Sequence, residues 1–201
     1  QMQTSFGFNL LALDKGKPLL LNLKNFLNKF IEFREEVVAR RTIFDLEKAR
    51  ERSHILCGLA VAVSNVDEVI SIIRNSENPS KAKEALMSTK WTVKELSQYL
   101  ELIDDPMHKI REDGTYLLSD QQAKAILELR LQRLTALGAS EIGGELEELA
   151  DKIRVCLDIL KSRERIRQII STELLEVREN YAVPRKSEIQ EFEGDFEDED
   201  L

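Results

Sequence analysis

The basic residues most able to bind a polyanion lie in the segment Glu32–Leu56, which reads EFREEVVARRTIFDLEKARERSHIL. Six arginine and lysine side chains there could contact phosphates, but six aspartate and glutamate side chains lie among them. Several opposite charges, such as Glu36 with Arg40 and Asp45 with Lys48, have the spacing at which side chains pair on a helix. Affinity for DNA needs an uncompensated cationic surface, because it comes mainly from counterion release at phosphates. We therefore interpret this segment as the solvated face of a helical arm.

The segment Lys161–Gln168, KSRERIRQ, is the most basic cluster and the candidate for transient contact with duplex DNA. The net charge of −8 comes from the acidic tail Glu188–Leu201, whereas residues 1–187 carry 29 acidic and 29 basic side chains. Direct binding of DNA is therefore expected to be weak and salt-sensitive. The tail could attract a metal ion, but without fixed geometry it is interpreted as a solvated linker.

Histidine and cysteine side chains predict no further site. His54 and His108 are isolated in sequence, and Cys57 and Cys156 form no C-x-x-C motif. We expect no catalytic, metal or cofactor site in this chain, and a reducing cytoplasm as its setting. No stretch approaches the roughly 18–20 apolar residues of a membrane span, and no signal peptide is recognised.

Long helices are predicted for most of the chain, because it is 6% aromatic and 33% charged with few Gly or Pro residues. Before them, two apolar runs flank Asp14–Lys17, which predicts a β-hairpin with Gly16 supplying a positive φ. From Asn22, the predicted N-cap, helix formers continue until Pro79. Apolar residues three and four apart predict the seams of two coiled-coil arms. The seam residues are Phe26, Phe30, Phe33, Val37 and Phe44 in the first arm, and Leu146, Leu149, Ile153, Leu160, Ile166 and Ile170 in the second.

The two seams are separated by a long intervening segment, which predicts that the arms pair and that this segment folds at their end. We therefore expect an all-α fold, namely a long antiparallel coiled coil with a small globular helical head at its tip, plus a short N-terminal β-hairpin. The predicted divisions are hairpin 1–21, first arm 22–57, head 58–139, second arm 140–181 and acidic linker 182–201. The second arm starts at Ser140 or after Gly144, because each glycine in a helix interior costs about 1 kcal/mol. Within the head, Pro79 begins a helix that ends near Met87, and Trp91 or Thr92 begins another.

A dimer interface is predicted at the helix Ser119–Leu134, which opens with the capping-box residues Ser119 and Gln122. Its apolar residues lie on two sides, whereas an ordinary surface helix has one apolar stripe. One side is assigned to the core of the head and the other to a second copy across a two-fold axis. The predicted interface residues are Tyr116, Leu117, Leu118, Gln121, Gln122, Ala125 and Leu129.

Three segments carry a resemblance to a known family: SFGFNLLAL, VVARRTIFDLEKARERSHILCGLAVAVSNVDEVISIIR and YLLSDQQAKAILELRLQRLTAL. In this order, over almost the whole chain, they resemble the C-terminal part of the breakage-reunion region of bacterial DNA gyrase A subunits. The closing EDEDL resembles the acidic link into the DNA-wrapping domain of those subunits. The C subunit of topoisomerase four shares some of these patterns and is the alternative. RRTIFDLEKARER and the long insert between Arg74 and Tyr116 favour gyrase.

The resemblance implies the end of the tower domain, a coiled coil and a head that dimerises as the DNA exit gate. The family's nucleophile is a tyrosine preceded by arginine, and none of Tyr99, Tyr116 and Tyr181 has that context. Magnesium and ATP act in the whole enzyme through the gyrase B subunits, in a complex of two A and two B subunits that supercoils DNA. A stand-alone coiled-coil interaction protein is the other alternative.

Overall fold

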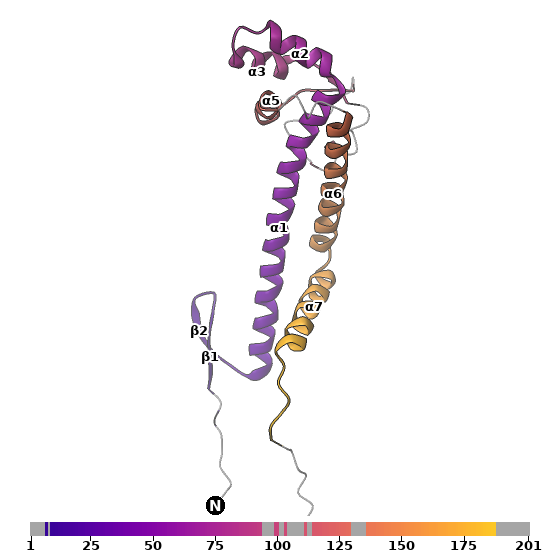
Figure 1. Ribbon diagram of the computed structural model, residues 1–201. Helices are drawn as coiled ribbons and strands as arrows, with labels where there is room; N and C mark the ends of the chain where they lie inside the picture. The colour runs from indigo at the N-terminus through magenta and orange to yellow at the C-terminus, as the bar shows by residue number, and fades with distance from the viewer. Residues whose placement is uncertain are drawn as a thin grey trace, which may run out of the picture. The chain divides into compact units, whose positions relative to one another are not determined.

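The computed structural model describes residues 7, 9–93, 99–100, 103, 111, 114–129 and 136–187, with only the backbone for 136–139. The chain divides into two compact units. The terminal unit consists of Gln1–Val38 and Arg163–Leu201, and the central unit is Ala39–Ser162. Their elements are shown in Figure 1, and each unit is described by itself.

The N-terminal hairpin pairs β1 (Leu10–Asp14) with β2 (Lys17–Leu21) in antiparallel register. Lys15 and Gly16 form the turn with φ values of 50° and 79°. Two consecutive positive φ values are typical of the tight turns whose twist matches that of a hairpin. The predicted hairpin is confirmed.

The helix α1 (Leu23–Ser64) is 42 residues long, about 63 Å at 1.5 Å per residue. The side chain of Asn22 caps it, because Asn22 Oδ1 accepts a hydrogen bond of 2.8 Å from the backbone N–H of Asn25. Helix formers continue in the sequence until Pro79, but the structure bends by 91° before α2 (Val66–Asn75). At the bend, Asn65 Nδ2 donates to the carbonyl of Val61, a local bond of the kind that competes with the helical ladder.

No single helix in the described ranges is long and apolar enough to cross a membrane. The helices α1 and α2, taken together across their bend, would have the length and composition of a membrane span.

The next elements of the central unit are α3 (Pro79–Ser88), β3 (Trp91–Thr92), β4 (Thr115–Tyr116) and α5 (Asp120–Leu127). The prediction that a helix begins at Trp91 or Thr92 is wrong, because both residues pair with β4. The buried indole of Trp91 donates to the carbonyl of Leu86 at 3.0 Å, which holds the chain next to α3. The helix predicted to reach Leu134 ends at Leu127, and residues 130–135 lie outside the described part of the chain.

The last helices are α6 (Ala136–Lys161) and α7 (Arg163–Tyr181). Both predicted starts of the second arm are wrong, because α6 begins at Ala136 and continues through Gly143 and Gly144. The two glycines are exposed, whereas Ile142 and Leu146 beside them are buried. Burial of these apolar side chains offsets the low helix propensity of the glycines.

The core of the central unit lies where the C-terminal half of α1 meets α2, α3, α5, the two short strands and the start of α6. Leu56, Trp91, Tyr116 and Leu146 are among its fully buried side chains. A smaller cluster joins α1 and α6 through Leu46, Ala49, Ile153 and Cys156. Farther along α1, Arg52 pairs with Glu145, which precedes those α6 residues in the chain, so the two helices run antiparallel in this unit (Figure 1).

The predicted seam of the first arm is wrong in phase, because the structure exposes Phe26, Phe30, Phe33 and Phe44 and half-buries Val37. The buried residues of this part of α1 are Val38, Thr42, Leu46, Ala49 and Ser53. They also recur every three or four residues, on a stripe rotated by about one residue from the predicted one.

In the second arm, Leu146, Ile153, Ile166 and Ile170 are buried, and Leu149 and Leu160 are half-buried. The all-α fold with an N-terminal hairpin is confirmed.

Candidate dimerisation site and interhelical contacts

The start of α5 is tied to α1 by buried hydrogen bonds centred on Gln122, whose side chain is 0% exposed. Ser119 Oγ accepts from the N–H of Gln122 at 3.2 Å, and Gln122 Oε1 accepts from the N–H of Ser119 at 3.0 Å. This reciprocal pair is the predicted capping box. Gln122 Nε2 also donates to the carbonyl of His54 at 2.6 Å, and His54 Nε2 shares a 2.7 Å hydrogen bond with Ser119 Oγ. The helix start is therefore held in one position against α1.

Tyr116 completes this polar network from β4. Its hydroxyl donates to Gln122 Oε1 at 3.1 Å and accepts from Gln122 Nε2 at 2.9 Å. Gly58 makes the arrangement possible, because a Cβ at that position would lie 2.6 Å from Cβ and Cγ of Gln122. A buried network of this kind rigidifies a core when each member has a partner.

Tyr116, Leu118 and Gln122 are wrong as dimer-interface residues, because all three are buried inside the chain. The pairing of β4 with β3 and the capping box turn these side chains inward. Sequence periodicity does not reveal either contact, because the partners are Trp91 in one case and His54 in the other.

The other predicted interface residues lie on a partly exposed surface. Gln121 is exposed, whereas Leu117, Ala125 and Leu129 are half-buried. Ala125 and Leu129 also pack against the core of the central unit, so each has only part of its side chain available to a partner. We call Leu117, Gln121, Ala125 and Leu129 the α5 surface.

Asp120 in the first turn of α5 accepts hydrogen bonds from Lys83 and, at 2.9 Å, from Lys124. Lys83 and then Lys124 hold the pKa of the Asp120 carboxyl below its usual range. An acidic side chain at a helix N-terminus is also favoured by the helix dipole. These contacts link α3 to α5 at the edge of the α5 surface.

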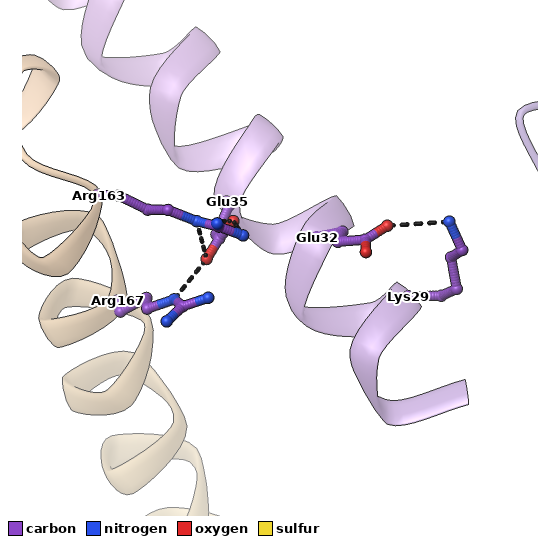
Figure 2. Close-up of polar contacts among 5 residues, drawn as sticks. All are labelled: Lys29, Glu32, Glu35, Arg163 and Arg167. Atoms are coloured by element: carbon purple, nitrogen blue, oxygen red, sulfur yellow. Dashed lines mark hydrogen bonds and ion pairs between the residues drawn. The ribbon is translucent and has the colours of Figure 1, made fainter. Parts of the chain in front are cut away.

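In the terminal unit, Glu35 joins α1 to α7 by accepting hydrogen bonds from two arginines (Figure 2). Arg163 Nε lies 3.0 Å from Glu35 Oε2, and Arg167 Nε lies 2.7 Å from Oε1. These contacts, with Arg163 the larger cause, lower the pKa of the Glu35 carboxyl. The Arg34 guanidinium makes a further contact of 2.6 Å with Glu173. Two arginines of the predicted DNA-contact cluster therefore share a counter-charge within the chain.

The remaining candidates for chemistry are mostly buried. His54 lies in the network above, and His108 lies outside the described residues. Cys57 and Cys156 are buried and free in different apolar clusters, and burial raises the pKa of the Cys57 thiol to about 12. Among the residues that the structure describes, no group of three or more His, Cys, Asp or Glu side chains is placed to hold a metal ion.

Gly58 and Glu35 are structurally important residues that the sequence does not single out. A glycine inside a run of helix formers is a signal of close backbone approach, and Gly58 is such a glycine. Glu35 has no comparable signal, because its partner Arg163 is 128 residues away in the chain.

Comparisons with known proteins match nearly the whole chain. The family model for the A subunits of DNA gyrase and topoisomerase IV matches residues 1–175. The DNA gyrase A subunit of Rickettsia felis is 46% identical over 200 residues, which are 98% of this chain and 22% of that protein. Its counterpart in Haemophilus influenzae is 47% identical over 208 residues, 100% of this chain and 23% of that protein. The chain thus spans about a fifth of the length of these curated relatives, and it belongs to the family of DNA gyrase and topoisomerase IV A subunits.

Proposed function

We propose that this chain is the non-catalytic exit-gate segment of a DNA gyrase A subunit, and that its head, residues 58–139, pairs with a second copy. The observation that carries the proposal is that the rest of the chain covers one side of α5 more completely than the other. One side is anchored to α1 by the Gln122 network, whereas the α5 surface keeps apolar and polar groups partly uncovered. A rigid element with an incompletely covered face suits an interface that must separate without unfolding.

The α5 surface supports a small interface of mixed polarity. Gln121 is exposed and can form hydrogen bonds with water when the gate is open, whereas Ala125 and Leu129 supply limited apolar area. A two-fold axis through this surface would bring the same patch from both copies together. Such an interface separates at a lower free-energy cost than one built from fully apolar side chains, because less apolar area becomes exposed to water.

In the whole enzyme, this segment would pass a transported DNA duplex out of the complex. The parent protein would act in a complex of two A and two B subunits that introduces negative supercoils by ATP-dependent double-strand passage. Magnesium and ATP would act there through the B subunits. The two free cysteines agree with the reducing cytoplasm expected from the sequence. Matches to gyrase A subunits along the chain argue against a stand-alone coiled-coil protein.

Sedimentation of single substitutions on the α5 surface tests the proposal. Ala125→Glu and Gln121→Arg are expected to convert a dimer into a monomer, because each would place two like charges together across the two-fold axis. Gln121 is exposed, so its variant should keep the native helical content.

Ala85→Glu is the matched control, because Ala85 is a half-buried alanine that belongs to α3 and is not one of the residues of the α5 surface. It should stay dimeric. A native chain that is monomeric at every accessible concentration, or a Gln121→Arg variant that dimerises as well as the native chain, would overturn this placement of the interface.

A further inference from the structure

We propose that the acidic tail, Glu188–Leu201, docks into a groove of the terminal unit between α1 and α7 and shields the arginines there from DNA. The proposal does not depend on the exit-gate role. The groove has a volume of about 710 Å³ and an apolar floor that includes Ile31, Ile170 and Leu174. Ile31 and Leu174 are exposed, although both are large aliphatic side chains. An apolar floor of this kind favours an occupant with apolar groups of its own.

Cationic side chains line the same groove. Arg163, Arg167 and Arg178 line the groove, against the single carboxylate of Glu32. Arg163 and Arg167 share the charge of Glu35, and Lys29 contacts Glu32 at 3.0 Å (Figure 2). The guanidinium of Arg178 makes no hydrogen bond or ion pair with any residue in the described part of the chain. The groove therefore combines apolar surface with a surplus of positive charge.

The acidic tail has the complementary composition. It reads EIQEFEGDFEDEDL, with eight acidic residues and no basic one. Phe192 and Phe196 stand four residues apart among the acids. Carboxylates can accept hydrogen bonds from guanidinium groups, while an aromatic ring covers the aliphatic floor. DNA phosphates supply negative charge but have no group that would bury Ile31 and Leu174, so the groove fits the tail better.

The chain is long enough for the tail to reach this groove. Leu174 and Arg167 lie 7 and 14 positions before Tyr181 on α7, about 10 and 21 Å along the helix axis. Residues 182–187 are exposed and continue away from the end of α7 (Figure 1), and six extended residues span about 20 Å. The fourteen residues of the tail span up to about 46 Å, so a tail that turns back after Ser187 can bring Phe196 to Leu174 and its last acidic residues to Arg167.

Photo-cross-linking in the full chain tests the docking. Phe196→p-benzoylphenylalanine should give, on irradiation, cross-links to residues of the groove such as Ile31, Leu174 or Leu175, identified by mass spectrometry. Arg178→Glu should lower the cross-link yield about fivefold, because it replaces an attractive contact with a repulsive one. Arg178 is exposed, so circular dichroism should show unchanged helical content.

Arg165→Glu is the matched control, because it makes the same charge change on α7 at a residue that does not line the groove. Its yield should equal that of the chain that carries the p-benzoylphenylalanine substitution alone. A mixture of ¹⁴N-labelled and ¹⁵N-labelled chains separates cross-links within one chain from those between chains. Equal yields in Arg178→Glu and Arg165→Glu, cross-links mainly between chains, or cross-links spread outside the groove would each overturn the proposal.

Discussion

The helix α1 contributes to both compact units, but its surroundings differ between them. In the central unit its residues Leu56, Cys57 and Leu59 are buried in the larger apolar core. In the terminal unit Phe30 and Phe33 of the same helix are exposed, with Phe33 at 56% exposure. Ion pairs such as those of Glu35 link α1 to α7 there.

The difference has energetic consequences. Full burial of a large apolar side chain contributes about 1.5–3 kcal/mol, whereas an exposed ion pair contributes about 0–1 kcal/mol. The central unit is therefore expected to hold its helices together mainly through its own core. The terminal unit presents unburied aromatic side chains and an apolar groove that a further segment can cover.

The largest difference in the free energy of unfolding should appear between two alanine substitutions on α1, one in each unit. Leu56→Ala should lower the free energy of unfolding by about 3 kcal/mol, because it leaves a cavity around a side chain that is 1% exposed. Phe30→Ala, in the terminal unit, should cost less than about 1 kcal/mol, because the Phe30 ring is exposed. Urea denaturation followed by circular dichroism measures both. Equal losses would contradict the proposed difference between the units.

A smaller loss is expected from Gly58→Ala in the central unit. The added Cβ would lie 2.6 Å from the side chain of Gln122 and push it away from His54 and Tyr116. Overpacking together with weakened buried hydrogen bonds should cost about 2 kcal/mol. Thermal or urea denaturation would report the change. Unchanged stability would show that the Gln122 network adapts to the methyl group.

Gly143→Ala in α6 is the opposite case and should stabilise the chain by about 1 kcal/mol. Gly143 is exposed and helical, and an added Cβ would meet no atom within 4 Å. The same denaturation experiment applies. A destabilised variant would indicate that this face of α6 contacts a partner in the native assembly.

The smallest effect concerns the Glu35 ion pairs and depends on pH. Because the folded-state pKa of Glu35 is lowered, its contribution to stability is present above the unfolded pKa and is lost as the pH falls through the folded pKa. Glu35→Gln should therefore cost up to about 1 kcal/mol at neutral pH. The gap between the native and variant free energies of unfolding should shrink below about pH 4, near the unfolded pKa of a glutamate. A gap that stays constant down to pH 2 would show that the ion pairs do not stabilise the unit.

Signals carried by neighbouring residues were sufficient to predict several parts of the fold. The turn between Asp14 and Lys17, the Asn22 cap and the capping box of Ser119 and Gln122 all appear where the sequence places them. Each depends on hydrogen bonds or backbone angles within about four residues, so local chemistry determines it. The same applies to the long helical stretch that begins at Leu23.

Contacts between distant segments decided the rest. Two stripes of α1 have nearly the same spacing, and packing against α6 selects the one that contains Leu46 and Ala49. Trp91 becomes a strand residue because Tyr116 pairs with it, and Gln122 turns inward because the carbonyl of His54 accepts its hydrogen bond. Apolar burial and long-range hydrogen bonds outweigh helix propensities of less than about 1 kcal/mol per residue. For that reason, the sequence by itself determined where most helices and turns begin, and only the tertiary structure decided which of their faces are buried.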